Sequence, residues 1–460
     1  MNQSLQEKSK QLYEFVCFTG VLLFAVLPMY MVLGPEKYGI TFKSFAFVEV
    51  LILLVCFLVY LIHIASLLRN VTLKQVISDV KKGLCSFFSD QRYGILFVLV
   101  FVLAVISALL ANDRQRAFSG TDFRPDGVLM YACFMSLFIF ASSLKSQKYK
   151  QAVSVCYTIS FVIVSFVMIQ QYYGVIGTAQ KADTPKILLP LKELYSDLGI
   201  ITGHFYKGMT GTFYNSNHMG YYIAVCSGLF TGLFIKSENK FSATVLFILI
   251  GYSFWILIIN NTFGAYIAVF VAVLLYGIYF IITKRTGTVK ALLPVLLFIC
   301  VSLSFSLASS STDESIIQKN FVQTSKDIKN IAQAEDKTTV KGGSGRWQLW
   351  VNTLDMISDE PVIGYGPDNL KTPSIMHRMK MDRAHNEFLE ISAAIGVPGG
   401  IFYYIGILAA VICSMRRKRI HSVSLGASVA VFAYLISSLF GVFLFYTACH
   451  LFVMLGLMKE

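Results

Sequence analysis

The chain has 460 residues, of which 55% are hydrophobic and only 14% are charged, and its mean hydropathy is +0.64. Soluble globular proteins carry roughly 25% charged residues, so this composition excludes a soluble enzyme and indicates an integral membrane protein. The formal net charge of +13 does not indicate a nucleic-acid partner. Much of the Lys and Arg lies in short loops between apolar runs, where positive charge fixes the orientation of a membrane protein.

The pattern of cysteine and acidic residues argues against disulfides and metals. The nine cysteines include no CxxC pair, so neither a structural disulfide nor a zinc site is expected. No group of Asp and Glu has the spacing of metal ligands, and we expect neither a metal nor another cofactor. The first apolar run is not followed by a small-residue cleavage site, so we expect it to remain as a helix.

Repeated apolar runs of about 20 residues are long enough to cross a hydrocarbon core roughly 30 Å thick as helices. Strands of a membrane barrel would instead alternate apolar and polar residues. We therefore predict an all-α integral membrane protein with about twelve transmembrane helices. The first six cover about 15–33, 45–68, 93–111, 128–144, 152–176 and a run that ends near 235.

The apolar run 241–283 is too long for one crossing, and Asn260-Asn261-Thr262 divides it into two spans. The last four spans cover about 291–308, 398–415 and, shared by two helices, 425–458. The chain thus has three parts. Residues 1–308 form spans one to nine, residues 309–386 form a long polar loop, and residues 387–460 form spans ten to twelve.

The positive residues predict the orientation of the chain. With the N-terminus inside, the inner short loops and termini carry about 20 Lys and Arg, against about 9 in the outer short loops, the asymmetry expected of a cytoplasmic side. Both termini are then cytoplasmic, and the long loop is extracytoplasmic. Four polar clusters fall on this outer side, at 113–126, 181–218, 260–262 and in the long loop.

The long loop has a folded part. Its first portion, 309–341, is expected to be partly helical and more mobile. After it, hydrophobic residues recur at helical spacing, namely Trp347, Trp350, Val351, Leu354 and Ile357. Pro361 ends that helix, and the sequence Gly-Tyr-Gly-Pro at 364–367 predicts a compact turn.

Four short motifs resemble those of one family. His385-Asn386, then nine residues, Gly396, two residues and Gly399, resembles the H-N-x9-G-x2-G signature of the O-antigen ligase and polymerase superfamily. The segment from Arg346 to the turn at 361–366 is similar to the segment that precedes this signature in the family. The stretch GTFYNSNH at 211–218 resembles its G-T-F-x-N-x-N element, and FRPDG at 123–127 resembles its R-x-x-G element. The resemblance covers about residues 90–458 in the same order.

This resemblance implies a GT-C-like, metal-independent membrane glycosyltransferase in the bacterial cytoplasmic membrane. The donor would be a glycan on undecaprenyl pyrophosphate. The acceptor would be a hydroxyl on another lipid-linked glycan for a polymerase, or on a lipid, wall or protein anchor for a ligase. We favour the polymerase, because no separate anchor-recognition domain is visible. A flippase and a chain-length regulator are the further partners that such an enzyme implies, and nucleic acid is not among them.

The chemistry of this reaction fits the residues of the motifs. A departing pyrophosphate concentrates negative charge, which the guanidinium fork of an arginine stabilises. The attacking hydroxyl must lose a proton, and an imidazole suits that role. The implied catalytic residues are His385 and Arg346. The implied donor-binding residues are Arg124, Lys207, Asn215, Asn217 and His218, and the implied substrate-lining residues are Tyr365 and Asn386.

A structural role remains an open alternative for several of these residues. Arg346 also fits a lipid headgroup anchor, and Tyr365 also fits a plain turn. Asn386 and Asn215 both fit helix caps. One departure from the family also matters. Phe263 stands where family ligases often carry the arginine of a Ser-Arg-Gly element.

A transporter or flippase for a lipid-linked or anionic solute is the main alternative of another class, followed by a structural or sensor membrane protein. Transport sites lie near the bilayer midplane, with polar residues or broken helices there. In this chain the centres of the spans are almost free of charge, and polar residues gather at the outer ends. This distribution favours an enzyme.

Overall fold

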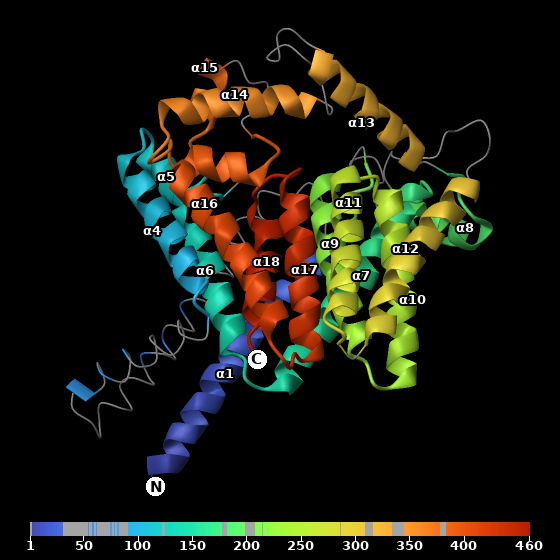
Figure 1. Ribbon diagram of the computed structural model, residues 1–460, viewed down its shortest axis with the longest axis horizontal. Coiled ribbons are helices and arrows are strands. Elements are labelled where there is room, and N and C mark those ends of the chain that lie inside the picture. Colours follow the sequence, from blue (N-terminus) through green and yellow to red (C-terminus); the bar gives the residue numbers. More distant parts are fainter. Residues whose placement is uncertain are drawn as a thin grey trace.

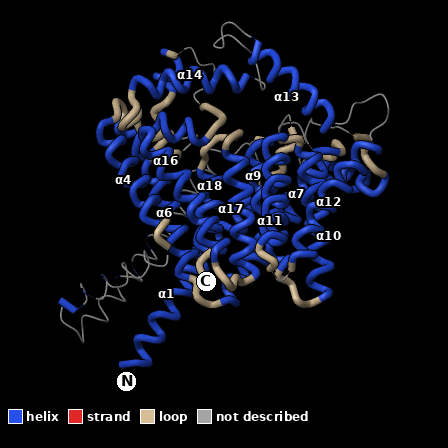
Figure 2. Tube along the Cα trace, viewed as in Figure 1, coloured by secondary structure: helices blue, strands red, loops and turns tan. Residues whose placement is uncertain are grey.

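The computed structural model describes residues 2–30, 91–121, 125–176, 182–197, 208–213, 215–285, 287–308, 316–333, 345–377 and 383–460, with a few isolated positions between 54 and 81. Every regular element in these ranges is a helix, and they contain no strand (Figures 1 and 2).

Seven of the described helices contain a stretch that is long and apolar enough to cross a membrane. They are α1 (Asn2–Tyr30), α7 (Gln147–Tyr172), α9 (Ser216–Ile235), α10 (Lys240–Asn260), α11 (Phe263–Ile282), α12 (Thr288–Ala308) and α16 (Glu387–Arg416). Four shorter helices are apolar as well, namely α4 (Gly94–Leu110), α6 (Val128–Ser143), α17 (Ser422–Ser438) and α18 (Phe445–Leu457). The chain is therefore built as a multi-pass membrane protein, as predicted.

The division of the long apolar run is confirmed. Helix α10 ends at Asn260, and Asn261 takes a left-handed conformation with φ 57° before α11 begins at Phe263. Asparagine tolerates this backbone region better than most residues, so the polar turn is well suited to reverse the chain. The span predicted at 45–68 lies outside the described residues.

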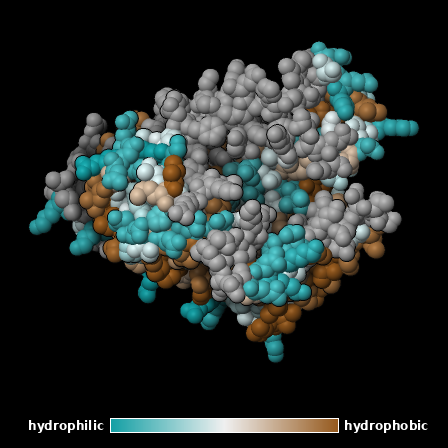
Figure 3. All heavy atoms as spheres, turned by 90° about the horizontal axis from the view of Figure 1, so that it is seen from above, coloured by the Kyte–Doolittle hydropathy of each residue, from teal (hydrophilic) through white to brown (hydrophobic). Residues whose placement is uncertain are grey.

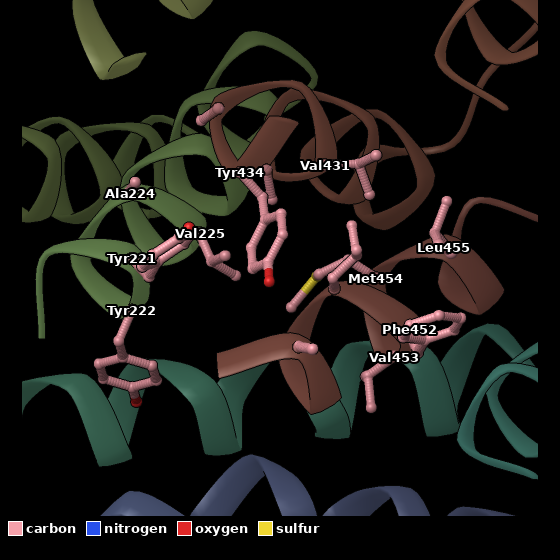
Figure 4. Packing of buried hydrophobic residues seen from close by; sticks show 14 of the residues in the cluster. Tyr221, Tyr222, Ala224, Val225, Val431, Tyr434, Phe452, Val453, Met454 and Leu455 are labelled. Atoms are coloured by element: carbon pink, nitrogen blue, oxygen red, sulfur yellow. The ribbon is translucent and has the colours of Figure 1, made fainter. Parts of the chain in front are cut away.

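Helix α9 is the centre of the bundle, since 94% of its apolar window is buried, whereas α12 at the periphery has only 17% buried. Its Gly228 and Gly232 face Ala430 and Gly426 of α17, and a Cβ placed on Gly232 would come within 2.3 Å of the Gly426 nitrogen. Small residues spaced four apart allow two helix backbones to touch in this way. Large apolar side chains, several of them aromatic, fill the interior around this pair (Figure 4).

The two chain termini lie at the same end of the bundle (Figure 1). Cations cap helix ends there. The Arg285 guanidinium donates to the carbonyl oxygens of Met415 (2.8 Å), in the last turn of α16, and of its C-cap Arg417 (2.7 Å). Lys150, which is fully buried, donates to the carbonyl of Lys459 after α18. Positive side chains satisfy the unpaired carbonyls of helix C-termini and complement the helix dipole.

The opposite end carries the polar elements. These are α5 (Arg114–Ser119), η3 (Lys186–Leu188), α8 (Leu189–Asp197), α13 (Ile316–Gln333), α14 (Arg346–Asp359) and α15 (Lys371–Met376). Helices α13 and α14 lie across this end of the bundle (Figure 1). Seen from above, this end shows patches of hydrophilic residues, and hydrophobic residues are visible at its edge (Figure 3). The helix predicted from the spacing of Trp347 to Ile357 is α14, which ends two residues before Pro361.

Candidate active site

Three elements distant in sequence bring polar side chains together at this end. Arg346 is the first residue of α14, and its Nη2 donates to Oδ1 of Asn217, in the first turn of α9, at 3.5 Å. His385 immediately precedes Asn386, the N-cap of α16. It lies close enough to Arg346 for its imidazole to interact electrostatically with the guanidinium group. Tyr221, one turn further along α9, lies near Arg346 as well. The structure therefore brings together three of the predicted residues, namely Arg346, Asn217 and His385.

Burial shapes the electrostatics of this group. It is the main factor that lowers the pKa of His385 to about 4, and the positive charge of Arg346 lowers the pKa further. The imidazole is therefore neutral near pH 7, and its buried Nδ1 has no hydrogen-bond partner within the described chain. Burial also lowers the pKa of Arg346. A partly buried cation beside a neutral imidazole is an arrangement that favours an anionic ligand.

Two of the predicted asparagines cap helices. Oδ1 of Asn386 accepts a hydrogen bond from the Leu389 amide at 3.2 Å, which caps α16. Oδ1 of Asn215 accepts from the Asn217 amide at 2.8 Å, which caps α9. The capping alternative is thus what the structure shows for both. His218 is buried in the same first turn of α9, whereas the neighbouring Asn217 faces Arg346.

The turn after α14 and the break in α16 fit into each other. The amide of Tyr365 donates to the Ala393 carbonyl at 2.9 Å, and the amide of Val397 donates to the Pro361 carbonyl at 2.8 Å. Gly364 and Gly396 both have positive φ, 72° and 81°. A Cβ at either position would approach backbone atoms of the other segment, at 2.6 Å for Gly364 and 2.0 Å for Gly396. Both glycines are required by this close contact as well as by their backbone angles.

This contact fixes where α14 and α16 sit relative to each other. The turn at 364–367 was predicted from the sequence, but its contact with the break in α16 was not. The Tyr365 hydroxyl donates to the Met356 carbonyl of α14 at 3.1 Å. Tyr365 therefore ties the turn back to the helix that begins with Arg346.

A buried ionic cluster, which the sequence did not predict, lies just before His385. The Arg383 guanidinium pairs with Asp126 (2.9 Å), Asp368 (2.8 Å) and Glu390 (2.5 Å), and all four side chains are buried. Buried charges persist in proteins when they are paired and hydrogen-bonded. The cluster joins the loop before α6, the turn after α14 and the first turn of α16. A signal was present in the sequence, since charged residues lie on both sides of His385, namely Arg383 before it and Glu387 and Glu390 after it.

A second buried group was also missed. Glu387 is fully buried in the first turn of α16, and its two carboxyl oxygens accept hydrogen bonds from the hydroxyls of Tyr434 (2.9 Å) and Tyr403 (3.3 Å). Tyr221 lies beside the same carboxyl group. The rings of Tyr221 and Tyr434 are 4.9 Å apart (Figure 4). The signal in the sequence was an acidic residue that opens an apolar helix.

The remaining predicted donor-binding residues, Arg124 and Lys207, lie outside the described residues. The polar turn between α10 and α11 lies next to the site. The side-chain Nδ2 of Asn260 donates to the backbone carbonyls of Met209 (2.7 Å) and Ser216 (3.1 Å) and thereby joins this turn to the start of α9. Phe263, which by the sequence resemblance stands where related ligases often carry an arginine, is the first residue of α11. Within the described ranges, no group of three or more His, Cys, Asp or Glu side chains could hold a metal ion.

Residues 245–404 match the family model described as O-Antigen ligase. The match begins in α10 and ends in the second half of α16, so it includes Arg346, Tyr365 and His385 but not Asn217. Neither a curated protein nor a solved structure matches the chain.

Proposed function

We propose, from the match of residues 245–404 to the O-antigen ligase family model, that the chain is a membrane glycosyltransferase of the O-antigen ligase and polymerase superfamily. It moves a glycan from a polyprenyl pyrophosphate, with undecaprenyl as the lipid, to an acceptor hydroxyl on the outer face of the bacterial cytoplasmic membrane. The observation that carries the proposal is the meeting of Arg346, Asn217 and His385 at one end of an apolar bundle.

In the proposed reaction the acceptor oxygen attacks the anomeric carbon of the donor sugar. The bond between that carbon and the pyrophosphate oxygen breaks, and its electron pair leaves with the pyrophosphate. The proton of the acceptor hydroxyl passes to His385. Arg346, with Asn217 as its neighbour, stabilises the negative charge on the departing pyrophosphate. No metal or other cofactor takes part in this proposal.

The donor itself would prepare His385 for this role. In the empty site the positive charge of Arg346 lowers the pKa of the imidazole. A bound pyrophosphate pairs with that charge and adds its own negative charge, and both changes raise the pKa. A base works best when its pKa lies near the operating pH, so His385 becomes a stronger base once the donor is in place.

We also propose the twelve-span, GT-C-like arrangement. Seven long apolar helices, four shorter ones and the span predicted at 45–68 together make twelve. Both termini are then cytoplasmic, residues 1–308 and 387–460 form the spans, and residues 309–386 form the extracytoplasmic loop with α13 and α14.

Of the two reactions, polymerisation of a surface polysaccharide is the one we propose, because the residues that the structure describes include no separate domain for anchor recognition. Attachment of a finished glycan to an anchor is the alternative. For the polymerase, a second lipid-linked glycan is the acceptor, and a flippase and a chain-length regulator are the expected partners.

The test compares surface glycan and lipid-linked intermediates in cells that carry His385→Ala or Arg346→Ala. Loss of surface polymer with accumulation of single lipid-linked repeats supports the polymerase, and accumulation of long lipid-linked chains indicates the ligase. The matched controls are His377→Ala in the same loop and Arg114→Ala, an exposed cation of α5 at the same end. Normal polymer in both test variants at normal protein levels would show that these residues do not carry the reaction.

A further inference from the structure

The backbone of His385 is held in an unfavourable conformation. Its φ is 51°, in the left-handed region that glycine adopts most readily. A side chain with a Cβ persists there when the surrounding structure imposes the conformation. The residues on both sides of His385 show what imposes it.

On the N-terminal side, the ion pairs of Arg383 with Asp126, Asp368 and Glu390 anchor the chain two residues before His385. These partners come from the loop before α6, the turn after α14 and α16 itself. On the C-terminal side, the anchor is Glu387, two residues after His385, and it has a different chemistry.

Glu387 is anchored by neutral hydroxyl groups. Tyr434 comes from α17, and Tyr403 comes from α16 beyond its break at 395–396. The carboxyl group therefore ties the first turn of α16 both to the second half of the same helix and to a neighbouring span. Since its side chain is fully buried, Glu387 does not meet a substrate that enters from the outer face.

We propose that Glu387 is a positioning residue of the transfer site, which holds the imidazole of His385 in place through the hydroxyls of Tyr403 and Tyr434. It acts as a hydrogen-bond acceptor and takes no proton from the acceptor sugar. The consequence for the rate rests on the proposed function, whereas the geometry can be tested without any glycan.

The geometric test treats the purified protein in nanodiscs with diethyl pyrocarbonate at one neutral pH. Peptide mass spectrometry then gives the rate at which His385 is modified. His377, on the same face and hydrogen-bonded to Asp359 at 3.0 Å, is the internal reference. In Glu387→Ala and Tyr434→Phe, the partly buried His385 becomes more exposed and reacts several-fold faster, while His377 does not change. The matched control is Tyr276→Phe, which removes a similar buried hydroxyl contact to Ser428 (2.6 Å) away from the site.

An unchanged rate at His385 in both variants would overturn the proposal. The proposal would also be overturned if the modification rate rose at His377 as well as at His385, and if the Tyr276→Phe protein showed the same rise. That result would indicate that the whole protein is destabilised. Glu387→Ala is the variant most at risk of failing to fold, and Tyr434→Phe, which removes a single oxygen atom, keeps the test decisive.

The kinetic test uses lipid-linked repeat units extracted from the parent bacterium. Misplacing a catalytic group by about 1 Å costs up to about 100-fold in rate, so Glu387→Ala lowers kcat strongly with little change in KM for the donor. Glu387→Gln keeps more of the rate than Glu387→Ala, since an amide can still accept one hydroxyl and donate to the other. Equal losses in the Gln and Ala variants would show that the carboxylate charge or proton matters, and positioning would be rejected. If neither the parent nor any variant transfers glycan, the proposed function fails, while the modification rates still decide the geometry.

Discussion

The two ends of the bundle use their cations in different ways. At the end with the termini, the Arg285 guanidinium donates to two carbonyl oxygens within 2.8 Å, and buried Lys150 donates to another. At the opposite end, Arg346 has a neutral amide oxygen of Asn217 at 3.5 Å as its hydrogen-bond partner within the described chain. A cation whose donors are already occupied supports the fold, whereas a half-buried cation with unused donors is available to a ligand.

Arg383 shows that position alone does not make the distinction. It lies at the same end as Arg346, but three carboxylates surround it. Its Nη1 and Nη2 donate to carboxylates inside the protein, and we assign it to the fold. Four measurements can break or sharpen this division between structural and ligand-binding cations.

The largest effect is expected for Arg383→Ala. Removing one partner from a buried ionic group leaves uncompensated charge and destabilises a protein by about 3–5 kcal/mol. We expect a large fall in the midpoint of thermal unfolding in detergent and a low yield of folded protein. A variant with parental thermal stability would contradict the structural assignment of this arginine.

The next effect is expected for Arg346→Ala, in binding rather than in stability. Hydrogen bonds to charged groups contribute about 1.5–3 kcal/mol, which corresponds to about 10- to 100-fold in affinity. We expect weaker binding of undecaprenyl pyrophosphate, measured by the fluorescence of Trp347 and Trp350, at unchanged thermal stability. Arg114→Ala is the control. Equal affinity in parent and Arg346→Ala would place the ligand-binding cation elsewhere.

A smaller effect is expected at the other end, for Arg285→Ala. The carbonyls of Met415 and Arg417 lose a donor, at a cost of about 1 kcal/mol in stability for an interaction that solvent can partly replace. We expect a small decrease in the unfolding midpoint and an unchanged transfer rate per folded molecule. A specific loss of transfer would mean that this end also contributes to the site.

The smallest effect concerns pH. A base acts when it is deprotonated, and kcat/KM reports the pKa of the free protein. Because the pKa of His385 is lowered to about 4, kcat/KM should stay level down to pH 5 and fall only as the pH drops through about 4. In Arg346→Gln one of the two causes of the lowered pKa is gone, so the fall moves to higher pH. A profile for this variant that coincides with that of the parent would contradict the coupling of the two residues.

The helices were predictable from the sequence because a span is a local property of composition. The two helices on either side of Asn261 and the helix that begins at Arg346 follow from apolar runs and their breaks. The helix caps at Asn215 and Asn386 were foreseen as alternatives for the same reason, since a cap concerns residues at most three positions away.

The surroundings of the site were not predictable in this way. Arg383 and Asp126 are 257 positions apart, and Glu387 meets a tyrosine from another span. Such pairs form only when the packing of the helices is known, and an acidic residue at the start of an apolar helix does not reveal its partner. The contact between the glycine turn and the break in α16 likewise consists of backbone groups, which every residue possesses.

The close approach of α9 and α17 has a consequence for how the membrane acts on the site. Where Gly232 meets Gly426, the backbones of α9 and α17 are in direct contact, with no side chains between them. Asn217 stands on one of these helices and Tyr434 on the other. A thinner or thicker bilayer would tilt this pair as one body rather than separate its members, so both residues would keep their spacing while the lipid around them changes.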